Sequence, residues 1–550
     1  MTLSAVMRVA SKIVLAFAAG GCSAPPCQPV QPLVTLPVHE SAHRVRLLEG
    51  GFESLVTRVD LIRSARRSIT IQTFIWRNDE AGRLLLFELI EAARRGVTVR
   101  VLADQMFSEN DAEVAAVAAT AHEQVAVRAY NPIADRVAPT LLASLSKVLL
   151  DFRNLNQRMH NKVMVVDGEV AVTGGRNIQN AYFDLDPRLN YRDRDVVVRG
   201  PAVSAMIVSF EEYWSSPLAV PLDSLLDVAD CIARADLPSL RDARDFGVAE
   251  VRAEVDRDLP HEPARRSRDE MTVDRVAFLA DVPGKNSATW LDASGRITEQ
   301  LVTVLCGAER EVLIQSPYLV LGDRASALLG GLRDADVDVV ISTNSLAATD
   351  SWQTYGIFYQ QKRRILDDLD LEVHELKPVP LGARARRPEP ETAAFYCLHS
   401  KSMVIDDRLG MVGSYNLDPR SGNLNTEVAL LVFDEAFAGR LEASIREDVA
   451  PDQSWVLAER DRPLLFAWVG DLADGCSDLL RRATTLDPLP SRFASCFELR
   501  PGEPPVSRRH PAFHDRYDEV GNFPGLGIAD QKVILARLVK GLGGVVTPIL

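Results

Sequence analysis

The sequence lacks the excess of basic residues on which sequence-independent nucleic-acid binding depends. Its 62 Lys and Arg residues are outnumbered by 76 Asp and Glu residues, and the formal net charge is −14. Because such binding rests largely on Lys and Arg contacts to phosphates, we expect no nucleic-acid partner. Basic residues gather only at 384–387, at 508–509 and in the C-terminal tail. These clusters either meet anionic lipid headgroups or lie in solvated loops.

The N-terminus lacks an apolar run long enough to span a bilayer, because residues 13–19 are too few. Arg8 and Lys12 precede this run and small residues lead into Cys22, which is the pattern of an export signal. The residues before Cys22 resemble a bacterial lipoprotein box, so Cys22 is the predicted lipidation site. We expect a membrane-anchored lipoprotein of the cell envelope that faces the periplasm. An ordinary cleaved signal and an uncleaved anchor are the alternatives.

Cysteine is also scarce, with seven residues in 550. This number is compatible with export but does not prove it. If Cys22 is lipidated, six remain, and of these Cys306 and Cys397 are expected in the core. Cys476 and Cys496 form the one pair that we nominate for a disulfide.

One pattern of polar residues is present twice. His160-x-Lys162-(x)4-Asp167 returns as His399-x-Lys401-(x)4-Asp406. In both copies an Asn follows the His by seventeen positions and ends a turn of small residues. The turn residue and the Asn are Gly175 and Asn177 in the first copy, and Ser414 and Asn416 in the second. Two matches with matched flanks indicate a duplicated active site rather than chance.

The local pattern predicts how each copy presents its side chains. Residues 159–168 are typical of a strand that an Asp-Gly turn ends, so His160 and Lys162 project from the same strand face. Residues 169–173 are the predicted returning strand. Each half therefore offers a His, a Lys, an Asn and a small-residue turn. This set suits an anionic phosphate that is attacked from one side and protonated on the other.

The flanks of the two copies repeat as well, over about 240 residues. Each half shows an apolar-periodic helix, a strand, another helix and a buried strand. The first helices are 52–65 and 297–308, the first strands 68–76 and 311–319, and the later strands 97–103 and 337–342. This alternation predicts an α/β sheet sandwich in each half.

Segments 154–162, 174–178 and 413–427 resemble the phospholipase D superfamily, and within it the bacterial cardiolipin synthases of the branch without an N-terminal pair of membrane spans. The resemblance covers roughly residues 45–445. It implies an α/β fold in which two similar phospholipase D-like sandwich domains pack as a pseudo-dimer, with the active site at their interface.

The resemblance also implies ping-pong phosphatidyl transfer through a phosphohistidine. By family analogy His160 is the nucleophile and His399 the general acid. Lys162, Lys401, Asn177 and Asn416, with Gly175 and Ser414, would hold the phosphate. No cofactor is expected, and no metal, because two ammonium groups supply the positive charge. Asp193 and Glu427 match the residues that orient each His, Asp195 is a rival for the first, and plain salt bridges are the alternative. Asp167 and Asp406 would complete the motif and brace the site.

Three functions remain open. The leading one is synthesis of cardiolipin from phosphatidylglycerol and a second phospholipid at a membrane surface. A hydrolytic phospholipase D would share every catalytic residue, and an exported nuclease or other phosphodiesterase is disfavoured by the acidic composition. The need for a partner protein stays unknown.

The expected organisation follows from these signals. A signal peptide (1–22) and a Pro-rich tether (23–45) precede domain 1 (46–240), a charged connector (241–272), domain 2 (273–450) and a C-terminal extension (451–550). Residues 531–550 carry apolar residues near helical spacing. They either lie in a membrane interface or pack on the protein's own surface.

Overall fold

The computed structural model describes residues 35–105, 108, 111–139, 156–234, 246–285, 295–378, 395–461, 493–527 and 530–546. The predicted signal peptide with Cys22, the basic cluster at 384–387 and Cys476 lie outside them.

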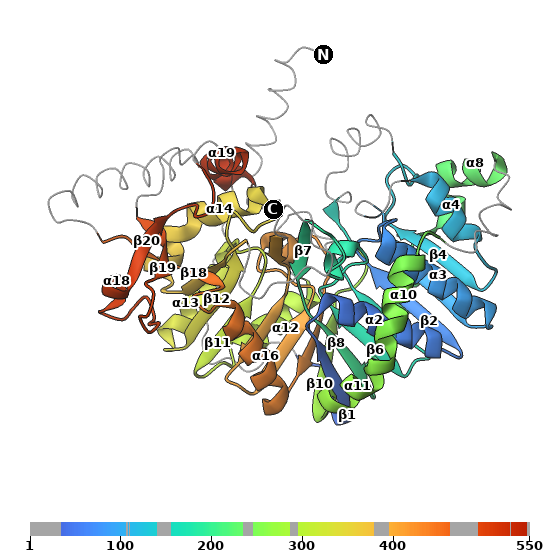
Figure 1. Cartoon of the computed structure of the whole chain (residues 1–550), viewed down its shortest axis with the longest axis horizontal. Helices are drawn as coiled ribbons and strands as arrows, with labels where there is room; N and C mark the ends of the chain where they lie inside the picture. Colours follow the sequence, from blue (N-terminus) through green and yellow to red (C-terminus); the bar gives the residue numbers. More distant parts are fainter. Residues whose placement is uncertain are drawn as a thin grey trace, which may run out of the picture.

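The first half alternates strands and helices in the predicted order (Figure 1). Strands β2, β3 and β4 are parallel, and β5, β6 and β8 continue the sheet in antiparallel fashion. The elements are β1 (Val38–Leu48), α2 (Gly51–Ser64), β2 (Ser68–Thr73), α3 (Glu80–Arg94), β3 (Thr98–Asp104), α4 (Ala112–Thr120), β4 (Val125–Tyr130), β5 (Val163–Val166), β6 (Val170–Gly174), β7 (Leu189–Arg192), β8 (Asp195–Arg199), α7 (Ala202–Trp214), β9 (Ala219–Pro221) and α8 (Leu226–Arg234).

The second half repeats this order. Its elements are β10 (Met271–Ala280), α12 (Arg296–Leu305), β11 (Glu311–Gln315), α13 (Asp323–Asp334), β12 (Asp338–Asn344), α14 (Trp352–Arg363), β13 (Glu372–Leu376), β14 (Phe395–Leu398), β15 (Ser402–Ile405), β16 (Leu409–Gly413), α15 (Pro419–Asn423), β17 (Val428–Val432), α16 (Glu435–Asp448), β18 (Ser454–Glu459), β19 (Ala494–Leu499), β20 (Tyr517–Gly521) and α19 (Gln531–Val546). The predicted helices and strands therefore agree with the structure to within a few residues at their ends.

A single 18-stranded sheet runs through both halves. Its order is β9-β4-β3-β2-β5-β6-β8-β1-β10-β17-β16-β15-β11-β12-β13-β18-β19-β20, and the antiparallel pair β1 and β10 joins the halves at its centre. The predicted α/β pseudo-dimer is confirmed. Central strands such as β6 and β17 are apolar and buried along their whole length, as expected where both faces of a sheet are covered.

The two outer helical layers each have their own core, and a third core is built from both halves. In this shared core Val163 and Val165 of β5 meet Val404 of β15 and Val428 of β17. Because β5 and β15 follow the two motif histidines directly, this packing sets the distance between the two copies of the motif.

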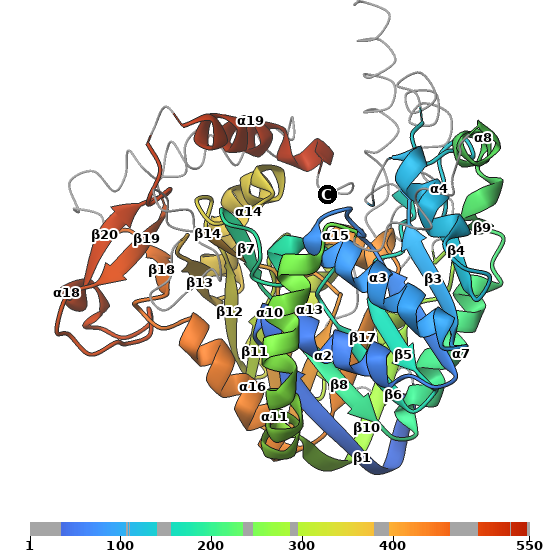
Figure 2. The same ribbon diagram turned by 45° about the vertical axis from the view of Figure 1, so that its right-hand side comes forward.

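The charged connector is helical and packs on the first half (Figure 2). It contains α10 (Ala249–Asp258) and α11 (Glu262–Asp269). Val251 and Val255 of α10 are buried in the core of the first half, and Glu262 forms a 2.8 Å ion pair with Arg46 of β1.

Two expectations need correction. The tether was expected to reach residue 45, but β1 begins at Val38 and pairs with β10 and β8, and residues 45–48 at its end are all buried. Domain 2 was expected to end at residue 450, but the 18-stranded sheet continues beyond it through β18, β19 and β20. Cys496 is a buried thiol whose Sγ lies 3.4 Å from Glu375 Oε1, and it forms no disulfide with any described residue. Its nominated partner, Cys476, lies outside the described residues, so that disulfide stays a prediction.

The C-terminal helix α19 packs on α14 (Figure 2). Val533 and Ala536 are fully buried, and Gly356 of α14 allows the close approach because a Cβ there would meet the Ala536 carbonyl. Ile534 stays 49% exposed. Within the described ranges we find no helix whose length and apolar character would let it cross a membrane.

Candidate active site

Each motif histidine is held by the backbone of the opposite half. His160 lies in the extended segment before β5, and its N–H donates to the carbonyl of Thr426 at 3.0 Å. His399 follows β14, which pairs with β7 of the first half, and its N–H donates to the carbonyl of Arg192 at 2.8 Å. The position of each imidazole therefore depends on both halves. The strand predicted at 159–168 is shorter than expected, since β5 begins only at Val163.

The carboxylates pair with the histidines crosswise. Nδ1 of His160 lies 2.8 Å from Oε2 of Glu427, and Nδ1 of His399 lies 2.7 Å from Oδ2 of Asp193. Each acid thus meets the imidazole of the other half. Since both Nδ1 atoms are engaged, Nε2 is the atom that each ring has left for chemistry.

The rival acid, Asp195, has a different place. Its carboxylate accepts from Ser54 Oγ at 2.7 Å and forms buried ion pairs with Arg58 and Arg176. It links α2 to the turn that precedes Asn177, and a structural role explains its burial.

The two lysines lie beside the histidines of their own motifs. Lys162 Nζ donates to the carbonyl of His160 at 2.8 Å, and Lys401 Nζ lies 2.7 Å from Nδ1 of His399. Burial lowers the pKa of Lys162 well below its usual value and that of Lys401 to about 8. An anionic ligand would favour the charged form of both lysines, so this pair favours a phosphate over a neutral substrate.

Burial also holds the pKa of both histidines well below the usual value, and the neighbouring ammonium groups of Lys162 and Lys401 lower it further. Both rings are therefore neutral at pH 7 in the empty site. Burial raises the pKa of Glu427 to about 7 and also raises that of Asp193, with the lysine charges opposing the effect.

The motif aspartates lie at the far end of the hairpins, as braces. Asp167 accepts hydrogen bonds from the N–H groups of residues 66, 67 and 68, and Asp406 from those of residues 309, 310 and 311. Burial alone would raise the pKa of both groups, but these donors outweigh it and lower the pKa. Each Asp also has a positive φ, 54° and 52°, which the hairpin turn requires. They fix the start of β2 and of β11 to the motif hairpin.

The predicted phosphate-binding residues fall into two kinds. Gly175 and Ser414 lie against the carboxylates: a Cβ at Gly175 would overlap the Asp193 carboxylate, whereas Ser414 Oγ donates to Glu427. The shorter acid thus faces a glycine and the longer acid a serine hydroxyl. Their contacts in this structure are with the carboxylates, and phosphate binding by them stays a prediction.

The two asparagines differ as well. Asn177 Oδ1 accepts from Ile75 N at 3.2 Å, and its Nδ2 donates to the Tyr182 hydroxyl at 2.8 Å. For Asn416 the backbone N–H donates to Ser421 Oγ at 3.1 Å, and its buried Oδ1 finds no hydrogen-bond partner in the described part of the chain. Asn416 is therefore the asparagine with unused capacity for a ligand.

Tyr182 is a site residue that the sequence reasoning missed. Its hydroxyl lies 3.3 Å from Nε2 of His399, and its ring stacks on Tyr191 with 4.4 Å between centroids. Burial and the charge of Asp193 raise the pKa of Tyr182 well above its usual value, so its hydroxyl keeps its proton. The signal available was spacing: Tyr182 follows Asn177 by five positions, as Ser421 follows Asn416.

Asp281 and Lys285 are buried braces on the other side of the site. Their 2.8 Å ion pair is almost fully buried. Asp281 also accepts from Glu427 N at 3.1 Å, and Lys285 Nζ donates to the carbonyls of Ser421 and Asn425. The segment that carries Glu427 is thus tied to the start of the second half.

Comparison with known proteins agrees with this duplicated arrangement. The family described as "Cardiolipin synthase, PLD-like domain" matches residues 59–214 and 301–449, one segment in each half. The chain belongs to the phospholipase D-like family.

Two relatives extend over most of the chain. An uncharacterized protein of Helicobacter pylori strain J99 is 30% identical over 75% of this chain and 80% of its own length. Cardiolipin synthase C of Escherichia coli K12 is 30% identical over 77% of this chain and 88% of its own length. As a member of this family the protein is an enzyme of the phosphodiesterase and phosphatidyltransferase type.

Among solved structures, the phosphatidylserine synthase of Haemophilus influenzae Rd KW20 has a TM-score of 0.51 at 17% identity, over 75% of this chain and 87% of that one. This likeness confirms the fold.

Proposed function

We propose that the protein is a phosphatidyltransferase that makes cardiolipin from phosphatidylglycerol and a second phospholipid through a phosphohistidine. The crossed pairs of His160 with Glu427 and His399 with Asp193, beside two buried lysines, carry this proposal. They supply two imidazoles, each with Nε2 as its reactive atom, and two lysine side chains that can bind one phosphate.

In the first half-reaction the Nε2 lone pair of His160 attacks the phosphorus of phosphatidylglycerol. The bond from phosphorus to the glycerol oxygen breaks, and His399 gives that oxygen its proton. The negative phosphate raises the pKa of His399 again, which allows it to carry this proton. Lys162 and Lys401 balance the charge that develops on the phosphate oxygens.

In the second half-reaction a primary hydroxyl of the acceptor lipid gives its proton to His399 and attacks the phosphorus. The bond from phosphorus to His160 Nε2 breaks and cardiolipin leaves. Water in place of the lipid hydroxyl would release phosphatidic acid, which is the hydrolase reaction.

The choice of His160 as nucleophile gains support from Tyr182. Its hydroxyl lies 3.3 Å from Nε2 of His399, so this nitrogen already has a hydrogen-bond partner. At the matching position of the second half Ser421 instead donates to Glu427 at 2.7 Å.

The direct test is a lipid profile of bacterial cells without their own cardiolipin synthases, with and without this protein. Cardiolipin that accumulates with the wild type and not with His160→Ala would support the proposal. Phosphatidic acid in its place would favour the hydrolase, and nuclease activity of the purified protein without any lipid change would contradict the proposal.

We further propose that the protein is a lipoprotein anchored through Cys22 at the periplasmic face of the envelope. Cys22→Ser should release it from the membrane fraction, as seen by fractionation and immunoblotting. Unchanged membrane attachment would contradict the lipid anchor.

A further inference from the structure

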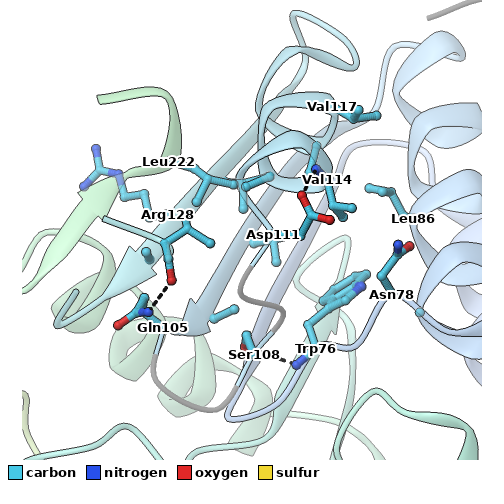
Figure 3. Close-up of a pocket in the computed structure, with 18 of the residues that line it drawn as sticks. Trp76, Asn78, Leu86, Gln105, Ser108, Asp111, Val114, Val117, Arg128 and Leu222 are labelled. Carbon is cyan, nitrogen blue, oxygen red and sulfur yellow. Dashed lines mark hydrogen bonds between the residues drawn. The ribbon is translucent and has the colours of Figure 1, made fainter. Parts of the chain in front are cut away.

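The first half contains an apolar cavity of about 330 Å³ in its helical layer. It lies between α3 and α4, above β3 and β4 (Figure 3). Leu86 of α3, Val114 and Ala118 of α4, and Val101 and Val127 of the strands contribute to its wall. Protein interiors hold few voids larger than a water molecule, and apolar cavities can take up apolar ligands.

The same space in the second half is filled. There α14 brings Tyr355, Phe358 and Tyr359 into one continuous core with Leu329 and Leu332 of α13. In the first half α4 offers mainly alanines and valines, and the helical layer divides into two separate apolar clusters. The small side chains of α4 thus account for the space that the cavity occupies in the first half.

Polar residues that line the cavity form hydrogen bonds with other residues of the protein (Figure 3). Gln105 Nε2 donates to the carbonyl of Val137 at 2.7 Å, Ser108 Oγ accepts from Trp76 N at 3.2 Å, and Asp111 caps α4. The wall of the cavity presents mainly aliphatic surface. A hydrocarbon chain is therefore the ligand that fits it.

Two contacts connect the wall of the cavity to the segment that carries His160. Trp76 lines the cavity, and Phe74, two residues earlier, lies edge-on to His160 with 4.6 Å between ring centroids. Asp104 also lines the cavity and accepts from the N–H of Met159, the residue before His160, at 2.9 Å. A lipid whose phosphate lies at His160 therefore has this cavity as its neighbouring apolar space.

We propose that the cavity binds an acyl chain of the phospholipid whose phosphate is attacked by His160. This inference rests on the proposed function and adds that the first half holds the diacylglycerol part of the donor. A bound chain would keep the phosphatidyl group in place while one headgroup leaves and the acceptor arrives.

The first test measures binding without catalysis, on the full-length protein. Dibromostearate, a brominated fatty acid, should quench part of the tryptophan fluorescence through Trp76. This part should vanish in Trp76→Phe and in Ala118→Phe, which fills the cavity. It should remain in Ala119→Phe, a matched control on α4 whose side chain is outside the cavity wall. Equal quenching in all four proteins would overturn the inference, and thermal melts verify that each variant is folded.

The second test compares dihexanoyl- and dioctanoyl-phosphatidylglycerol as donors below their micelle concentrations. Each methylene that enters the cavity should raise kcat/KM by up to about fourfold, the equivalent of ~0.8 kcal/mol. Ala118→Phe should flatten this chain-length dependence and spare hydrolysis of bis-p-nitrophenyl phosphate, which has no chain. An unchanged dependence in Ala118→Phe would overturn the inference. If wild type cleaves the soluble diester but neither lipid, the proposed function fails, and the quenching experiment still judges the cavity.

Discussion

The surroundings of His160 and His399 use the same residue types at the same spacing, yet they are not equivalent. Around His160 the second half supplies a long acid, Glu427, which two serine hydroxyls support. Around His399 the first half supplies a short acid, Asp193, and the hydroxyl of Tyr182. The shared residues suit the binding of one phosphate. The differences suit two distinct roles, nucleophile for His160 and general acid for His399.

The largest expected effect separates these tasks by the leaving group. His160→Ala should lower phosphatidyl transfer by about 10⁴-fold or more, and His399→Ala by about 10²- to 10⁴-fold. With a p-nitrophenyl donor, whose leaving group needs no proton, His399→Ala should regain a burst of nitrophenol and His160→Ala should not. Stopped-flow absorbance measures the burst. A burst in His160→Ala would reverse the assignment.

The histidines also act as one unit. The double variant should be little worse than His160→Ala alone, because catalytic groups that work together are not additive. A further loss as large as that of the second single variant would mean two independent sites.

The next effect comes from the residues that face the acids. Gly175→Ala should cost about 10²-fold in kcat/KM, since its methyl group would displace Asp193 and a misplacement of ~1 Å costs about that much. Ser414→Ala removes one hydrogen bond to Glu427 and should cost about five- to tenfold. Steady-state kinetics on both variants measure this difference, and equal losses would show that glycine and serine are not matched to acids of different length.

The pH dependence of kcat/KM should be narrow. The pKa of Lys401 is lowered to about 8, so its positive charge is lost as the pH rises through 8. The pKa of Glu427 is raised to about 7, so it gains a proton as the pH falls through 7 and ceases to be a carboxylate acceptor for His160. Activity should therefore fall on both sides of a window between about 7 and 8. A flat profile from pH 6 to 9 would contradict this account of the buried charges.

The smallest expected effect concerns Tyr182, whose counterpart in the second half, Ser421, has no phenol. Tyr182→Phe should lower turnover of phosphatidylglycerol about fivefold, the worth of one hydrogen bond of ~1 kcal/mol, and leave the nitrophenol burst unchanged. Ser421→Ala, its counterpart, should reduce the burst because Ser421 supports Glu427. Burst amplitudes and steady-state rates measured side by side test this. An equal effect of both variants on the burst would mean that Tyr182 does not act through His399.

The sequence predicted the helices, strands and polar residues of the site better than it predicted which residues contact one another. Periodicity predicted strand Thr98–Asp104 and helix Gly51–Ser64 almost to the residue, because local apolar patterns determine them. That Asp193 meets His399 depends on the pairing of β7 with β14, which lie far apart in the sequence. Tyr182 was missed because its repeat partner is Ser421, a residue of different chemistry, so the two copies share a spacing there but not a residue type.

The N-terminal strand was missed for a similar reason. Residues 38–45 follow a Pro-rich stretch and have no partner within their own neighbourhood, so they were assigned to the tether. Their partners, β10 and β8, come from both halves and make β1 a central strand of the sheet.

The most direct test of the two-histidine account is to locate the covalent intermediate. The variant His399→Ala is mixed with a phosphatidyl-p-nitrophenol donor, quenched at alkaline pH, digested and analysed by mass spectrometry. Without His399 to deprotonate the acceptor, the phosphatidyl adduct should accumulate, and it should lie on the peptide that contains His160. An adduct on any other residue, or a burst of nitrophenol with no adduct, would contradict the account.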